Sequence, residues 1–78
     1  MTDLDALLVT RAIADAGLAF HARYLCVDGR ARFGARYDTT SDLLRLGICL
    51  GQRGISPEAA ATGWSEPVEY GRFYGWEI

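Results

Sequence analysis

The chain has 78 residues, of which half are hydrophobic and 23% are charged. This composition excludes a disordered or collagen-like chain, and the length predicts a single domain, residues 1–78, with a thin core. The formal net charge of -2 excludes a protein that coats nucleic acid or an anionic membrane through bulk charge, so any such binding must be local.

The cysteines and the first residues bear on the cellular compartment. Cys26 and Cys49 lie in patterned segments rather than in a dense loop framework, so we expect reduced thiols and no disulfide scaffold. The segment from Met1 to Leu8 carries acidic residues where a signal peptide needs positive charge, and no apolar run reaches membrane-spanning length. We therefore expect a cytoplasmic protein without a membrane segment.

A helix is predicted from about Asp3 to Ala16. Thr2, followed three residues later by Asp5, is typical of a capping box, and Gly17 is expected to end the helix. One apolar arc faces the core, but three leucines flank the polar side: Leu4, Leu7 and Leu8. One buried face does not require them, so we expect the helix to be covered on two sides or to contact a partner.

A β-hairpin is predicted around Asp28-Gly29, because this pair favours the centre of a two-residue type I′ turn between alternating runs. A two-residue loop places Tyr24 opposite Phe33 and fixes the face of every side chain in both strands. One face then carries mostly apolar residues. The other carries His21 and four arginines, namely Arg23, Arg30, Arg32 and Arg36.

Two more helices are predicted in the second half of the chain. The first runs from about Ser41 to Arg53, and its Gly47 and Gly51 share a face that lets another backbone approach closely. In a soluble protein the expected reason is packing against a sheet or helix. The second begins at Ser56-Pro57, an N-cap followed by proline, and ends before Gly63.

The segment from Val68 to Ile78 alternates apolar residues with other residues and is predicted to be a third strand. The order of elements is then α-β-β-α-α-β. We expect an α+β fold with a three-stranded antiparallel sheet and the helices packed on one face.

The four arginines of the hairpin are the first candidate binding site. Guanidinium groups on one pleated surface can grip phosphates or an acidic protein patch. The alternative is a solvated outer face, partly neutralised if Glu69 and Glu77 lie beside it on the third strand. Exposed ion pairs add only about 0.2 to 1 kcal/mol each, so stability alone does not explain four arginines.

The aromatic C-terminal segment is a second candidate. Core packing accounts for most of its rings, although aromatic rings on a sheet can also stack on nucleobases. The exception is Phe73, which alternation places on the outer face between Gly71 and Gly75, where it could be an exposed contact for a partner.

Acidic side chains are a third candidate, because they could engage a basic DNA-binding surface of another protein. The alternative is an ordinary solvated surface. The acidic residues in question are Asp3, Asp15, Asp38, Asp42, Glu58 and Glu66.

We expect no catalytic site. The chain has one histidine and two separated cysteines, and no spacing unites a nucleophile, a base and an orienting group. In the expected register His21 and Cys26 lie on opposite faces. The sequence has neither a cluster of metal ligands nor a glycine-rich phosphate loop, so no metal or cofactor is expected.

In build, the chain resembles the small phage-encoded anti-CRISPR proteins: it is a tiny acidic α+β domain with a hairpin at Asp28-Gly29, a well-capped helix and no site chemistry. The resemblance covers the whole chain without a shared motif and carries over no functional residue. It implies a non-enzymatic inhibitor that binds a type I RNA-guided surveillance complex, a Cas complex, and blocks target DNA binding. A small rigid domain can do so through an interface of about 800 Å² per partner.

Two other functions stay open. A nucleic-acid-binding module would use the arginines of the hairpin, and its binding would fall steeply with salt. A self-associating structural protein of a phage or bacterium would use Leu4, Leu7 and Phe73. The expected oligomeric state is accordingly a monomer or a weak homodimer.

Overall fold

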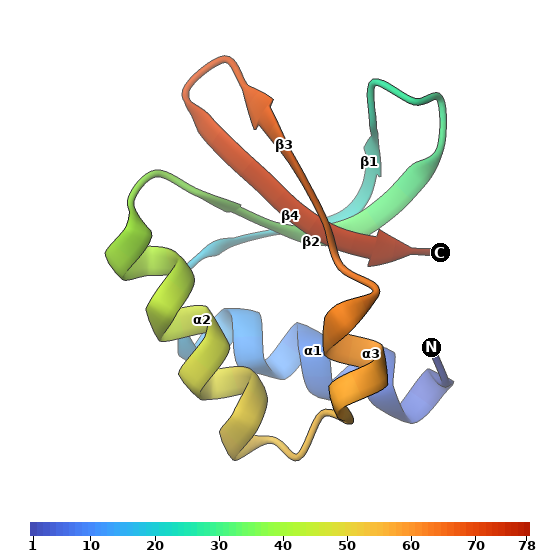
Figure 1. Cartoon of the computed structure of the whole chain (residues 1–78), viewed down its shortest axis with the longest axis vertical. Helices are drawn as coiled ribbons and strands as arrows, with labels where there is room; N and C mark the ends of the chain where they lie inside the picture. The colour runs from blue at the N-terminus through green and yellow to red at the C-terminus, as the bar shows by residue number, and fades with distance from the viewer.

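Three helices lie beneath a four-stranded antiparallel sheet in the computed structural model, which describes residues 1–78 (Figure 1). The strand order is β1-β2-β4-β3. The expected α+β class is confirmed, and the helices cover one face of the sheet. The elements are α1 (Asp3–Asp15), β1 (Ala19–Leu25), β2 (Ala31–Tyr37), α2 (Thr40–Gln52), α3 (Pro57–Ala61), β3 (Trp64–Val68) and β4 (Gly71–Glu77).

The expected three-stranded sheet is wrong, because the C-terminal segment forms a hairpin of two strands. β3 ends at Val68, the residue expected to begin a single last strand, and β4 begins at Gly71. The φ of Gly71 is 124°, a conformation that favours glycine. Ser65-Glu66-Pro67 has the composition of a turn, but β3 is an edge strand, where a residue without an N–H is tolerated.

Local capping signals set the helix starts. In α1 the Thr2 hydroxyl accepts a hydrogen bond from the N–H of Asp5, and in α2 the Thr39 hydroxyl accepts one from the N–H of Asp42. Each acid also bonds back to its N-cap N–H, which completes two capping boxes. The three predicted helices are confirmed to within one residue at each end.

The core fills the space between the helices and the sheet. Its buried residues are Val9, Ala12, Ile13, Ala16, Ala35, Leu46, Cys49, Leu50 and Trp76. The indole N–H of Trp76 donates to the carbonyl of Ala59 at 2.8 Å, and the Tyr74 hydroxyl donates to that of Ala60 at 3.1 Å. These bonds attach α3 to β4 and satisfy carbonyls that a helix end leaves open.

Two expectations about individual side chains have opposite outcomes. Cys26 and Cys49 are unpaired and buried, as expected. The leucines on the polar side of α1 are not buried in a second layer, since Leu4 and Leu7 are 64% and 49% exposed. Burial inside the fold therefore does not explain these two leucines.

The β1–β2 hairpin has a different register from the expected one. The N–H of Cys26 bonds to the carbonyl of Arg30, and Gly29 has a φ of 82°. The loop therefore has three residues and ends in a left-handed glycine. Tyr24 consequently lies opposite Arg32 rather than Phe33.

A β-bulge changes the register a second time. His21 pairs with Gly34 and Tyr24 pairs with Arg32, so Ala22 and Arg23 together oppose a single residue of β2. His21 and Tyr24 therefore both project from the sheet face without helices. The expected division of side chains is wrong, because Tyr24 lies with the β2 arginines instead of on the apolar face.

Two glycines, Gly34 and Gly75, pair across β2 and β4 in the middle of a curled sheet (Figure 1). A Cβ atom on Gly34 would collide with the backbone of Tyr74 and Gly75, and one on Gly75 would collide with the Phe33 carbonyl and the Phe73 ring. With the bulge, this pair lets both hairpins curl away from the helices, one at each edge of the sheet (Figure 1). We call this helix-free surface, which bears His21, Tyr24, Arg32, Arg36, Glu66 and Phe73, the curled face.

Candidate functional site

The two hairpins close over part of the curled face. The rings of Tyr24 and Phe73 stack with centroids 4.3 Å apart and planes 19° apart. The Glu66 carboxylate on β3 accepts a hydrogen bond from the N–H of Val27 at 3.1 Å, which joins the edge strand to the β1–β2 loop. Phe73 and Glu66 are 1% and 3% exposed, so both expected contact residues lie inside the fold.

Arg30 and Arg32 are paired with acids of the same chain. The buried Arg32 guanidinium donates to both carboxylate oxygens of Asp28, at 3.1 and 2.8 Å, and lies 4.5 Å from the centroid of the Trp64 ring. Arg30 donates to Glu77 at 2.8 Å. The bond from Arg32 holds the pKa of Asp28 below its ordinary value, and the bond from Arg30 does the same for the pKa of Glu77.

Arg23 and Arg36 take part in none of the five ion pairs of the chain. Arg23 is exposed at the bulge, whereas Arg36 is half-buried. Arg36 donates to the carbonyl of Tyr70 through Nε at 3.0 Å and also through Nη2. The four arginines therefore do not form one free basic surface.

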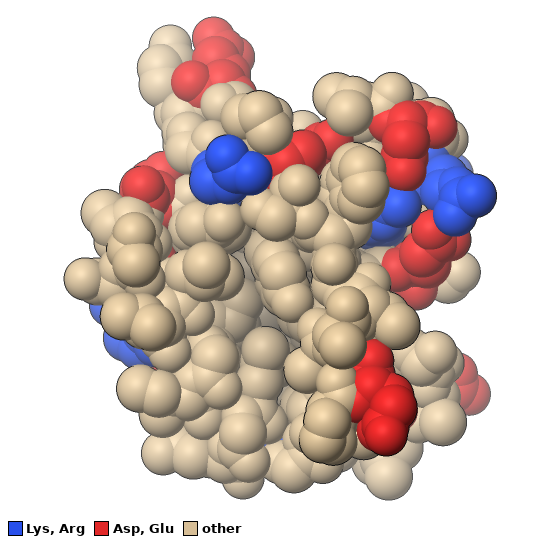
Figure 2. All heavy atoms as spheres, in the orientation of Figure 1, with Lys and Arg blue, Asp and Glu red and all other residues tan.

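Figure 2 shows acidic side chains at several separate places on one side of the molecule, and of the acidic candidates only Asp38 and Asp42 line a common hollow. Asp42 completes the α2 capping box and pairs with Arg45 at 2.9 Å, and Asp15 pairs with Arg53. The other three acidic candidates, Asp3, Asp38 and Glu58, are exposed. No single acidic patch results.

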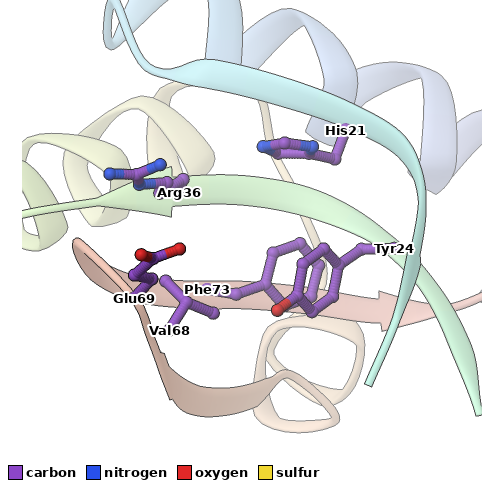
Figure 3. Close-up of a pocket in the computed structure, with 6 residues that line it drawn as sticks. All are labelled: His21, Tyr24, Arg36, Val68, Glu69 and Phe73. Carbon is purple, nitrogen blue, oxygen red and sulfur yellow. The ribbon is translucent and has the colours of Figure 1, made fainter. Parts of the chain in front are cut away.

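A hollow of about 190 Å³ opens on the curled face. In Figure 3 Arg36 and Glu69 lie toward one end of it and the Tyr24 and Phe73 rings toward the other. The lining residues are His21, Tyr24, Arg36, Val68, Glu69 and Phe73. A second, more open hollow of about 530 Å³ shares His21 and Arg36 and extends to the start of α2.

The geometry of the first hollow suits binding by rings and charge. His21 lies edge-on to Tyr24 and Phe73, with centroids 6.0 and 6.2 Å apart. Burial, with a smaller contribution from the charge of Glu66, raises the pKa of Tyr24. The lining has no Ser, Thr, Cys or Lys side chain. No three His, Cys, Asp or Glu side chains lie close enough together to hold a metal ion.

Sequence reasoning did not find this hollow. The sequence indicates Arg36 and Phe73 as candidates for other reasons, and it suggests Glu69 only as a neutralising charge. The bulge that turns Tyr24 onto the same face as His21 leaves no clear trace in the alternation, and the pattern predicts Val68 as the start of a longer strand.

The outward side of α2 is a second notable surface, which we call the α2 face: Leu44, Gly47, Ile48 and Gly51. Leu44 and Ile48 are 64% and 61% exposed. A Cβ atom on Gly47 or Gly51 would meet nothing within 4 Å, so no sheet or helix of this chain packs against these glycines. In Figure 2 the surface in the region of α2 carries few charged side chains.

No helix of this structure combines the length and the apolar character needed to cross a membrane. Comparison with known proteins gives no matching family model, no similar curated protein and no similar solved structure.

Proposed function

We propose that the chain is a non-enzymatic domain that acts in the cytoplasm by docking onto another protein through the α2 face. The observation that carries this proposal is the pair Gly47 and Gly51, which no contact inside the chain requires. Glycine in a helix interior costs about 0.5–1 kcal/mol relative to alanine. No contact within the chain offsets that cost. A partner whose backbone approaches α2 closely would offset it, because a Cβ atom at either position would hold the partner away.

The shape and charge of the α2 face indicate what the partner presents. Leu44 and Ile48 are exposed on the same side of α2 as Gly47 and Gly51, and small residues let two helices approach closely. Since the α2 face has no charged residue, a charge buried against it would be unpaired. An uncharged apolar helix of the partner therefore fits best.

The contact extends beyond α2. A standard interface covers about 800 Å² on each partner, about one sixth of the 4783 Å² surface of this chain. Neighbouring parts of the helical layer would therefore join α2. The two hairpins curl away from the helical layer and would stay outside such a contact (Figure 1).

A type I RNA-guided surveillance complex is the first partner to test, because the chain resembles anti-CRISPR proteins in build. Docking on such a complex would keep target DNA away without any chemistry. The test measures target DNA binding by the purified complex at increasing concentrations of the chain.

The decisive variant is L44D combined with I48D, which places charge on the α2 face. We expect it to weaken docking at least about tenfold, because two carboxylates would be desolvated without partners. L25D is the matched control, since Leu25 is also exposed but lies on β1, in a hairpin that stays outside the contact. Equal inhibition by the wild type and the double variant would contradict the proposal.

The same variants separate the alternatives. Salt-sensitive binding to free DNA or RNA that L44D/I48D leaves unchanged would favour a nucleic-acid-binding module. Concentration-dependent self-association in analytical ultracentrifugation, abolished by L44D/I48D, would show that a second copy occupies the α2 face.

A further inference from the structure

We propose that the hollow on the curled face binds a small carboxylate that carries a planar aromatic ring. This site lies on the sheet side opposite the helices, so it is independent of docking through the α2 face. Three observations carry it: a preformed aromatic wall, an arginine without an acidic partner, and a hollow whose volume of about 190 Å³ suits a small group.

The aromatic wall is fixed before any ligand arrives. Phe73 is 1% exposed and lies against Gly75, and Tyr24 stacks on it at 4.3 Å between centroids. His21 closes the wall edge-on to both rings, and Val68 adds an apolar side chain. A planar ring can pack on the half-buried Tyr24 and His21 in the stacked or edge-on arrangements that aromatic pairs favour, while the buried Phe73 holds the Tyr24 ring in place from behind.

Arg36 supplies the charge. Its guanidinium is oriented by the Tyr70 carbonyl through Nε and Nη2, which leaves Nη1 without a hydrogen-bond partner in the chain. Two other arginines of the β1–β2 hairpin, Arg30 and Arg32, differ from Arg36 because each forms an ion pair with a carboxylate. A half-buried, oriented guanidinium without such a partner is suited to a carboxylate from outside.

The volume of the hollow suits a small ligand. Pockets for drug-sized ligands and cofactors span about 300–1,000 Å³, whereas this hollow has about 190 Å³. One ring with a short acidic group suits this space. Such a group can come from a free small acid or from an aromatic residue at the C-terminus of another protein, which presents a ring and a carboxylate together.

Glu69 makes the charge preference testable. Its carboxylate lines the same hollow as Arg36, yet the two side chains form no ion pair. If Arg36 governs binding, an anionic ring compound binds best. If Glu69 governs it, a cationic one does.

The experiment titrates the full chain with three compounds that share one ring: benzoate, benzyl alcohol and benzylammonium. His21 is the only histidine, so its imidazole signals in NMR spectra at a fixed pH report on the hollow without overlap. We expect saturable shifts of the His21 and Tyr24 ring signals with benzoate, at an affinity about tenfold above that for benzylammonium. N-acetyl-L-phenylalanine distinguishes the sources: tighter binding than benzoate assigns a protein C-terminus, and weaker binding assigns a free acid.

Two variants with opposite effects test the role of charge. R36Q is expected to lower the benzoate affinity about tenfold, and E69Q to raise it by a smaller factor. R11Q is the control, because it removes the same charge from an exposed position on α1. V68W, which fills the hollow without changing any charge, is expected to abolish the shifts while the backbone spectrum stays folded.

The proposal is overturned if benzoate leaves the His21 and Tyr24 signals unmoved, or if benzylammonium binds as well as benzoate. It is also overturned if R36Q and R11Q, both folded by their amide spectra, bind benzoate equally. None of these results depends on partner docking through the α2 face, so either proposal can fail alone.

Discussion

Among single residues, Glu66 has the least favourable surroundings. It is 3% exposed, and its Oε1 has no hydrogen-bond partner. Its Oε2 accepts from the N–H of Val27 at 3.1 Å and from the indole N–H of Trp64 at 3.5 Å. A buried carboxylate with one open oxygen costs stability. Glu66 partly offsets that cost by tying β3 to the β1–β2 loop.

Other carboxylates make the stability of the fold depend on pH. The pKa of Asp28 is lowered first by the hydrogen bond from Arg32, that of Asp42 by the bond from the Asp38 N–H, and that of Glu77 by the bond from Arg30. Below the ordinary values of 3.8 for Asp and 4.5 for Glu, the unfolded chain binds more protons than the folded chain. Stability is therefore complete above these values and is lost as the pH falls through the folded pKa values.

We accordingly expect the urea midpoint to be constant from about pH 7 to pH 5 and to fall steadily below about pH 4.5. D28N removes one of the three carboxylates and should make the decline shallower. D3N, at an exposed acid outside these ion pairs, is the control. An unchanged midpoint at pH 3 would show that these carboxylates do not couple to folding.

At the scale of elements, α2 combines a well-made start with two costly glycines. We expect G47A and G51A each to raise the free energy of unfolding by about 0.5–1 kcal/mol, because the added methyl groups meet no atom and favour the helix. Urea denaturation measures the gain. A loss of stability in either variant would mean that the glycine has a packing role inside the chain.

The same two variants connect stability to function. If the α2 face docks a partner helix closely, the methyl groups of G47A/G51A hold the two backbones apart and weaken docking while the fold becomes more stable. Improved stability with unchanged docking would leave Leu44 and Ile48 as the only contacts on this face.

Local signals explain which elements could be predicted from the sequence. The helix starts can be predicted from capping residues, such as Thr2 with Asp5 and Ser56 with Pro57. These residues form hydrogen bonds or set the backbone within the first helical turn, so the signal is local in the sequence. Strand register depends on the turn length and on the bulge between His21 and Tyr24, which only the paired strand reveals.

The candidate site was harder to predict for the same reason. The sequence indicates Arg36 as a candidate binding residue because of its charge. The orientation of its guanidinium, however, depends on a hydrogen bond to the Tyr70 carbonyl, 34 residues further along the chain. Arg32 pairs with Asp28, which is close in sequence. The sequence pattern predicts a turn role for Asp28 and gives no sign of this ion pair. Residue type is therefore enough to name candidate binding residues. Only the tertiary fold shows which of them have no ion-pair partner within the chain.

For the whole molecule, the pair Gly34 and Gly75 controls the shape of the sheet. G34A places a methyl group against the Tyr74 carbonyl, so we expect a loss of about 1–3 kcal/mol in the free energy of unfolding. The nuclear Overhauser effects between the Tyr24 and Phe73 rings should weaken as the hairpins separate. G47A is the matched control in open space. A G34A chain as stable as the wild type would show that the backbone relieves the collision without cost.

The outer strands also affect how copies of this chain behave at high concentration. An exposed strand edge can recruit further strands and nucleate fibrils. Here the bulge interrupts the hydrogen-bonding row of β1, and Pro67 offers no N–H on β3. Both borders of the sheet are thus poor templates for strand addition, which helps a small domain with so many exposed apolar side chains to resist amyloid-like growth.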